Sequence, residues 1–146
     1  MNARAAGAAV LALATLAACA TAEGNATAYR EEAHSTLKAA RSPVETVHIT
    51  LGARLDDKLF ARSADDAVSS AEESLSGTAA TFSGLQPPRG ADKVRDAASK
   101  LLSDAQDAVE DARIAVRRDN PAAIRQAYDA IGRVSQALER AEEELA

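Results

Sequence analysis

Apolar residues recur every three or four positions along most of the chain, and no stretch alternates apolar and polar residues. Spacings of three and four place side chains on one face of an α-helix, whereas alternation would indicate a β-strand. The sequence therefore predicts an all-α protein. Four segments carry such a stripe, and we expect them to begin near residues 29, 64, 91 and 121.

The first segment has the longest stripe, and Pro43 lies inside it. Its apolar positions fall within an arc of about 80° on a helical wheel and keep their phase on both sides of Pro43. This favours one long helix kinked at Pro43. A break into two helices is the alternative, because proline removes a backbone hydrogen bond and restricts the preceding residue. The stripe consists of Tyr29, Ala33, Leu37, Ala40, Val44, Val47, Leu51 and Leu55.

Capping and breaking residues separate the other three segments. Ser63, followed by acidic residues, is typical of an N-cap for the second helix. The proline- and glycine-containing stretch 86–90 ends this helix, and Asn120-Pro121 separates the third helix from the fourth. The three stripes are Ala64, Val68, Ala71, Leu75, Thr78, Phe82 and Leu85; Val94, Ala98, Leu101, Ala105, Ala108, Ala112 and Ala115, widened by Leu102, Val109 and Val116; and Ile124, Ala127, Ile131, Val134, Leu138, Ala141 and Leu145.

Short connections between amphipathic helices favour antiparallel neighbours, so we expect an up-down four-helix bundle over residues 29–146. An extended coiled-coil dimer is the alternative, but the connections at 86–90 and 119–120 reverse the chain before one long seam can form. Hydrophobic residues make up 47% of the chain, and much of that fraction is alanine. We therefore expect the helices to pack closely on alanine and to gain stability from its high helix propensity.

The first 18 residues have the layout of a secretory signal peptide, with Arg4 ahead of an apolar stretch over residues 5–16. As a helix this stretch is about 18 Å long, too short to cross a hydrocarbon core of about 30 Å. It ends at Leu16-Ala17-Ala18-Cys19, which contains the only cysteine of the chain. These four residues resemble the lipobox of bacterial lipoproteins.

The resemblance implies removal of residues 1–18 and attachment of acyl chains, palmitate among them, to Cys19. A tether over 19–28 would then join the lipid anchor to the helical domain, on the extracytoplasmic face of the cell membrane. Two or more acyl chains give stable anchoring. Cleavage after Ala22 by an ordinary signal peptidase is the alternative, and it would release a protein without the cysteine.

The composition excludes several kinds of partner. The net charge is −5, and removal of Arg4 with the signal peptide makes the mature chain more acidic still. An acidic domain matches nucleic acid poorly, and a chain with 3% aromatic residues and no tryptophan offers little surface for base stacking. We expect no nucleic-acid partner, and the membrane is contacted through the lipid on Cys19.

Two glutamate–histidine pairs resemble the ligand units of di-iron four-helix bundles: Glu31 with His34, and Glu45 with His48. A dinuclear site needs its pairs on different helices, whereas both pairs here lie in the first segment. In one continuous helix they are about 21 Å apart. Both glutamates also point away from the apolar stripe. We therefore expect solvated side chains rather than a metal site.

Two acidic groups have the same interpretation. Asp104, Asp107 and Asp111 share one face of the third helix beside Glu110, with spacings that would allow cation binding, but such runs are usually the solvated face of an amphipathic helix. Near the C-terminus, Glu139, Glu142, Glu143 and Glu144 favour solubility. No Ser–His–Asp arrangement, phosphate-binding glycine loop or haem motif occurs, so the sequence predicts a protein that is not an enzyme and needs no cofactor.

Ile49 and Phe60 are two large apolar residues on the side of the first helix opposite its stripe, 11 residues apart. They predict either a partner contact or packing against a helix that turns at Pro43. The function that fits best is a non-catalytic interaction or scaffolding module of the bacterial cell envelope, with an envelope protein as its partner. The alternative is a bundle that binds or senses a small ligand or metal ion. Close alanine packing disfavours it unless a gap remains near Pro43.

Overall fold

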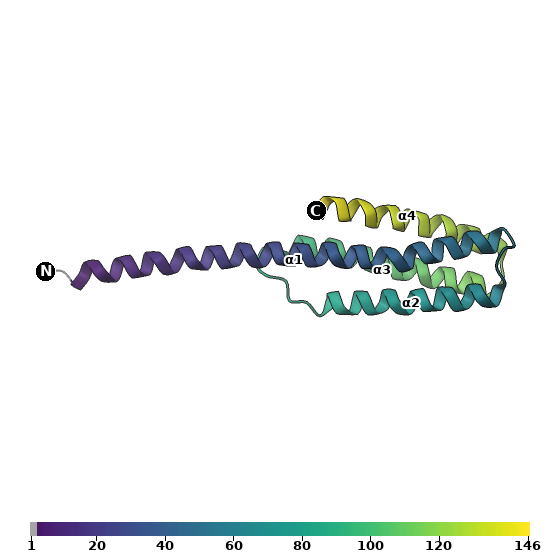
Figure 1. Ribbon diagram of the computed structural model, residues 1–146, viewed down its shortest axis with the longest axis horizontal. Helices are drawn as coiled ribbons and strands as arrows, with labels where there is room; N and C mark the ends of the chain where they lie inside the picture. The colour runs from purple at the N-terminus through teal and green to yellow at the C-terminus, as the bar shows by residue number, and fades with distance from the viewer. Residues whose placement is uncertain (1–2) are drawn as a thin grey trace.

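The computed structural model describes residues 3–146, with side chains from residue 25 onward. It has four helices: α1 (Ala3–Leu55), α2 (Ala61–Ser83), α3 (Asp92–Arg117) and α4 (Pro121–Leu145). No strand occurs within these described residues. The predicted all-α four-helix bundle is therefore confirmed. Figure 1 shows α1 running past the ends of the other three helices toward the N-terminus.

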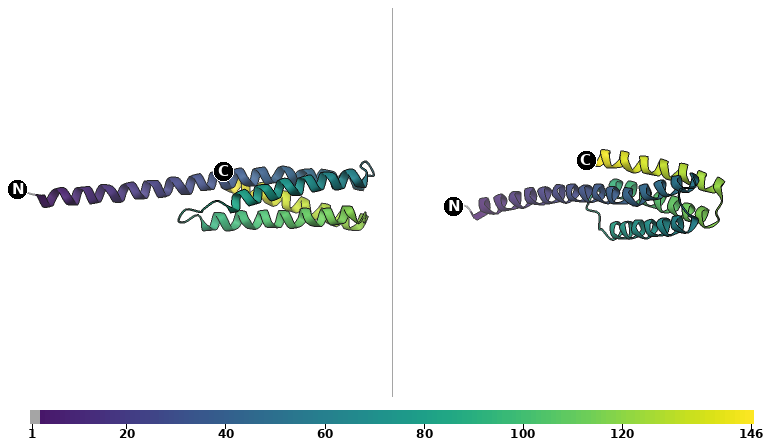
Figure 2. Two further views of the ribbon diagram at one scale, coloured as in Figure 1. Left: turned by 90° about the horizontal axis from the view of Figure 1, so that it is seen from below. Right: turned by 45° about the vertical axis from the view of Figure 1, so that its right-hand side comes forward.

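The long first helix is continuous through Pro43, as predicted, but the predicted kink is not seen (Figures 1 and 2). Pro43 is buried, and one turn later the Thr46 hydroxyl donates a hydrogen bond to the carbonyl oxygen of Ser42 at 3.0 Å. None of the three views in Figures 1 and 2 shows a sharp bend in α1. The helical backbone also extends through residues 19–28, where the sequence suggested a tether. One helix therefore joins the N-terminal segment to the bundle.

In the four-helix bundle, the diagonally opposed helices α1 and α3 lie closer together than the other diagonal pair, α2 and α4. α1 contacts α2, α3 and α4, whereas α2 and α4 do not contact each other in the described structure. Alanine explains the short diagonal, because Ala98, Ala105 and Ala112 of α3 are at most 2% exposed. Small side chains at these positions let α3 approach α1 across the bundle. Figure 2 shows the two remaining helices on either side of this pair.

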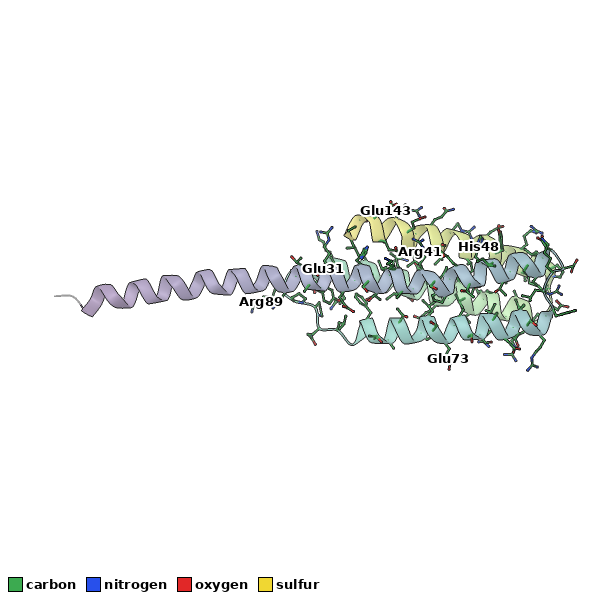
Figure 3. The ribbon with its side chains drawn as sticks, in the orientation of Figure 1. Glu31, Arg41, His48, Glu73, Arg89 and Glu143 are labelled. Carbon is green, nitrogen blue, oxygen red and sulfur yellow. The ribbon has the colours of Figure 1, made fainter. Side chains whose placement is uncertain are left out.

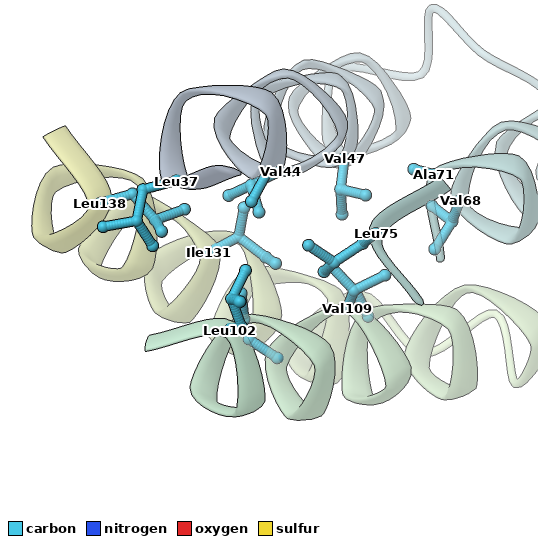
Figure 4. Packing of buried hydrophobic residues seen from close by; sticks show 14 of the residues in the cluster. Leu37, Val44, Val47, Val68, Ala71, Leu75, Leu102, Val109, Ile131 and Leu138 are labelled. Atoms are coloured by element: carbon cyan, nitrogen blue, oxygen red, sulfur yellow. The ribbon is translucent and has the colours of Figure 1, made fainter. Parts of the chain in front are cut away.

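The core follows the predicted stripes. Every α1 stripe position from Tyr29 to Leu51 is buried, and Figure 4 shows residues from all four helices packing together in one core. One α3 position differs from the prediction: Leu102 is 2% exposed, whereas Leu101 is only partly buried. Because both are leucines one residue apart, periodicity alone could not predict which of them is buried. Packing against the neighbouring helices selects Leu102.

The turn after α1 explains an error in the predicted start of α2. Asp57 has a positive φ of 57°, and Lys58 donates its backbone N–H to the carbonyl oxygen of Ala53 at 2.9 Å. These features close α1 with a Schellman motif. Phe60 is then extended and α2 begins at Ala61, with no side-chain cap. The prediction that Ser63 caps α2 is wrong, because the tight turn lets the helix start earlier.

The predicted end of α2 and the predicted starts of α3 and α4 are confirmed, whereas α1 begins well before residue 29. α2 ends at Ser83, just before the stretch 86–90, and α3 begins at Asp92. Asn120 is the N-cap of α4, where its side-chain oxygen accepts hydrogen bonds from the N–H groups of Ala122 and Ala123. Below, the "far end" of the bundle is the end with residues 56–60 and 118–120. The "near end" is the opposite end, with the α2–α3 connection and the C-terminus (Figure 1).

Candidate interaction surface

Cys19, the predicted lipidation site, lies in the part of α1 whose side chains fall outside the described residues. Its lipidation stays a prediction. Among the helices that the structure describes, none is long and apolar enough to cross a membrane.

Ile49 and Phe60, the predicted partner contact, are the large apolar side chains most open to solvent in residues 25–146. Ile49 is 72% exposed and Phe60 is 84% exposed. The prediction that both lie on one stripe of the first helix is wrong, because α1 ends at Leu55 and Phe60 precedes α2. Ile49 therefore lies in α1, whereas Phe60 lies in the connection to α2 at the far end of the bundle.

A shallow groove of about 310 Å³ runs between α1 and α2 beside Pro43. Its α1 wall contains Ser42 and Thr46, and its α2 wall contains Ser70 and Ser74. The groove is therefore lined by small side chains and hydroxyl groups. Ile49 follows Ser42 by seven residues, which is two helical turns, so it lies on the same side of α1.

The two glutamate–histidine pairs do not come together. α1 is continuous, and Glu31 and Glu45 are both exposed. In residues 25–146, no three histidine, aspartate or glutamate side chains are grouped so that they could hold a metal ion. Figure 3 places Glu31 near the N-terminal end of the bundle and His48 well along α1.

His48 instead packs against Tyr128 of α4. The two rings are stacked, with centroids 4.1 Å apart and planes inclined by 19°. Glycines leave room for them: a Cβ atom on Gly132 would lie 3.4 Å from Nε2 of His48, and one on Gly52 would lie 3.3 Å from Cε2 of Tyr128. This contact was not predicted from the sequence. Its signal is an aromatic ring followed four residues later by glycine, which occurs in both helices.

Arg41 links α1 to the acidic end of α4. Its Nε atom donates a hydrogen bond to Oε1 of Glu45 at 2.7 Å, and its Nη1 atom lies 3.5 Å from Oε2 of Glu142. Glu139 is also within 3.9 Å of Nη1. The hydrogen bond that Arg41 donates to Glu45, with the charges of the glutamates, raises the pKa of Arg41. Figure 3 shows Arg41 on the α4 side of α1.

Glu142 is therefore not one of the solvated glutamates that the sequence predicted. Its exposed fraction is only 9%, and its Oε1 atom is buried without a hydrogen-bond partner in the described structure. Glu143 and Glu144 are exposed, as expected. The difference arises because Glu142 follows Leu138 by four residues and so lies on the buried side of α4.

Arg30 closes the near end. Its Nη2 atom donates to the carbonyl oxygen of Glu144 at 2.6 Å, and its Nε atom donates to that of Leu145 at 3.1 Å. The last carbonyls of a helix have no intrahelical partner and carry partial negative charge. Arg30 thus satisfies them at a terminus where the glutamates alone would oppose the helix dipole.

The acidic face of α3 is exposed at Asp107, Glu110 and Asp111. Asp104 pairs with Lys100, one turn earlier, at 2.6 Å. Arg113 of the same helix lies 2.6 Å from Glu72 of α2 and joins those two helices. Within the described residues, the charged groups of α3 thus form ion pairs or face solvent.

No protein-family model, curated protein or solved structure matches this chain.

Proposed function

We propose that this protein is a lipid-anchored, non-catalytic interaction or scaffolding module of the bacterial cell envelope. The lipobox-like sequence around Cys19 supports the anchor. The observation that carries the scaffolding part is the backbone of α1, which joins the segment containing Cys19 to the core of the bundle without a loop (Figure 1).

A continuous helix fixes both distance and direction. At 1.5 Å per residue, Leu55 lies about 54 Å along the axis from Cys19. A flexible glycine–serine linker would let the bundle move freely about its anchor, whereas a helix holds it as an extension of the same rod. The far end, with its exposed Phe60, would then stand farthest from the membrane. This arrangement suits a protein that holds a contact at a set height.

The alternative function, binding of a small ligand or metal ion, would use the groove beside Pro43. Serine, threonine, alanine and proline line this groove, which is open along its length. Small-molecule sites usually enclose most of the ligand among large apolar side chains and a few polar groups. The groove is better shaped to receive another protein surface, so we favour the interaction function.

Intact mass and membrane fractionation test the anchor. The native protein is expected in the membrane fraction, with a mass for a chain that starts at Cys19 and carries acyl chains. Cys19→Ala should remove the acyl mass and release the protein from the membrane. Ala22→Leu is the matched control, because it blocks ordinary cleavage after residue 22 and leaves the lipobox unchanged. An unmodified native chain that starts at Glu23 would overturn the proposal.

A further inference from the structure

The α1–α2 side of the bundle has an outer face with no charged side chain along its two central rows. We call it the α1–α2 face. On α1 the row follows spacings of three and four on the side opposite the core stripe. On α2 it follows the same spacings along the wall of the groove. The α1 row is Ser35, Ala39, Ser42, Thr46, Ile49 and Ala53, and the α2 row is Phe60, Ser63, Ala67, Ser70, Ser74 and Gly77.

This face differs from the rest of a chain in which 27% of residues are charged. The charges of α2 lie elsewhere: Glu72 pairs with Arg113 on the α3 side, and Figure 3 shows Glu73 pointing away from α1. The uncharged rows also include the most exposed large apolar side chains, Ile49 and Phe60. Small side chains at spacings of three and four let the ridges of one helix approach another helix closely.

The Thr46 hydroxyl at the centre of the face can be buried at little cost. Thr46 donates to the carbonyl oxygen of Ser42 at 3.0 Å, and Thr81, one turn beyond Gly77, donates to the Gly77 carbonyl at 2.9 Å. Burial of a hydroxyl is costly when it loses its hydrogen bond to water without replacement. The Thr46 donor is therefore already satisfied within its own helix, so a partner surface can cover it without leaving it unpaired.

We propose that the α1–α2 face binds a second copy of this chain in a parallel, two-fold symmetric dimer. The protein has a net charge of −5, so two copies repel each other through most surfaces and can meet most easily through an uncharged one. A two-fold axis along the bundle makes the face complementary to itself and places the α1 row of each copy against the α2 row of the other at the same height. This inference rests on the proposed interaction function and identifies a second copy of the chain as a partner of the protein.

The size of the face fits this occupant. A helix of 23 residues is about 35 Å long, and two helices side by side are about 18 Å wide, which gives roughly 600 Å² per copy. Stable dimers bury about 800 Å² per copy in a typical interface. A modest, reversible dimer is expected. The small side chains permit close approach of the helices, and Ile49 supplies an apolar contact near the far end. The parallel orientation also leaves both anchor segments on one side.

Sedimentation of residues 25–146 tests the dimer, because this segment contains every core residue from Tyr29 to Leu138 and lacks Cys19. The segment should dimerise at micromolar to tens of micromolar concentration. Ser70→Glu places a charge in the centre of the face and should weaken dimerisation more than tenfold. Ser103→Glu, an equally exposed serine on α3, should leave it unchanged. Circular dichroism checks that each variant keeps its helices.

Thiol cross-linking tests the orientation. Ile49→Cys in residues 25–146 should be joined to its own copy by a bismaleimide that spans about 10 Å, because the parallel arrangement brings this far-end position within about one interhelical spacing of its own copy. Ser103→Cys should give few cross-linked dimers. A monomeric segment at 100 µM, or equal cross-linking at both positions, would overturn the proposal. Membrane fractionation of Cys19→Ala reports on the anchor alone, so failure of the dimer and failure of the anchor are distinguishable.

Discussion

His48 of α1 and Tyr128 of α4 stack across their interface with ring centroids 4.1 Å apart, and each ring lies against a glycine of the opposite helix. The glycines are Gly132 for His48 and Gly52 for Tyr128. In both helices the glycine follows the ring by one turn. Because α1 and α4 are antiparallel, the contact has an approximate local two-fold symmetry. It fixes the axial position of one helix against the other.

Gly52→Ala tests this contact. Alanine in place of glycine inside a helix gains about 1 kcal/mol from helix propensity. At Gly52 the added methyl group would lie 3.3 Å from Cε2 of Tyr128, so the ring must shift and much of this gain is lost. Gly77→Ala is the matched control, because a Cβ there meets no atom within 4 Å.

Urea denaturation of residues 25–146 at submicromolar concentration compares the two variants as monomers. Gly77→Ala should raise the free energy of unfolding by about 0.5–1 kcal/mol, and Gly52→Ala should raise it less or lower it. Equal gains at both positions would show that Tyr128 does not depend on the absence of a side chain at residue 52.

Because Glu142 forms an ion pair with Arg41, we expect substitution of Glu142 to lower the free energy of unfolding much more than substitution of the adjacent Glu143. Glu142→Ala removes the partner of Arg41 from a buried position and should lower the free energy of unfolding by about 1–2 kcal/mol. Glu143→Ala, at an exposed position, should change it by less than about 0.5 kcal/mol. Glu142→Leu should cost less than Glu142→Ala, since it replaces the buried carboxylate with apolar volume. Chemical denaturation measures all three, and equal effects of the two alanine substitutions would contradict the prediction.

We expect the free energy of unfolding to depend on pH above pH 10 because of Tyr29. It is 7% exposed, and its hydroxyl has no hydrogen-bond partner among the described residues. Burial raises the pKa of Tyr29 above its usual value of 10.0, although the charge of Arg95 opposes this shift. The unfolded chain therefore ionises first as the pH rises. The stability contributed by the neutral phenol is complete below pH 10 and is lost above it.

Tyr29→Phe should remove this effect and the unpaired hydroxyl together. At pH 8 the variant should be more stable than the native protein by about 1 kcal/mol. The difference should grow between pH 9.5 and 11, because phenylalanine has no proton to lose. Denaturation curves at several pH values check both points. A constant difference across this range would mean that Tyr29 ionises equally easily in the folded and unfolded chain.

The sequence predicted the parts of the fold that depend on one helix at a time. The stripe from Tyr29 to Leu51 is buried as expected, because its period places every member on one side of a helix. Asn120-Pro121 marks a boundary because capping is a property of adjacent residues. Leu101 and Leu102 could not be separated in this way, since both are apolar and only the neighbouring helix selects one of them.

Contacts between helices were not predictable from periodicity. The pairing of His48 with Tyr128, and of Arg41 with Glu142, depends on how far α1 and α4 slide along each other. No single-helix pattern contains that offset. The position of Phe60 was also misjudged, because the turn around Asp57 is made by an aspartate where a helix end more often has glycine.

Asp57 and Asp119 follow α1 and α3, and both have positive φ, 57° and 47°. Both aspartates pair with Arg54: its Nη1 atom lies 3.4 Å from Oδ1 of Asp57, and its Nη2 atom lies 2.5 Å from Oδ1 of Asp119. Left-handed backbone costs about 1 kcal/mol for most residues and almost nothing for glycine. Asp57→Gly should therefore raise the melting temperature, since its exposed, longer ion pair contributes little. Asp119→Gly should raise it less, because it also removes the shorter ion pair. A larger gain from Asp119→Gly would contradict the importance of that pair.

Asn120 and Ser63 both resemble N-caps in the sequence, but we expect alanine substitutions at the two positions to affect stability differently. The Asn120 side chain accepts two backbone hydrogen bonds at the start of α4, at 3.0 and 3.1 Å. Asn120→Ala should thus lower the free energy of unfolding by about 1 kcal/mol. Ser63 lies inside the first turn of α2, which begins at Ala61, so Ser63→Ala should change stability little or raise it slightly through helix propensity. Hydrogen exchange at the first turns of α2 and α4 separates the two cases. Faster exchange in α2 after Ser63→Ala would place the N-cap at Ser63 and the start of α2 after it.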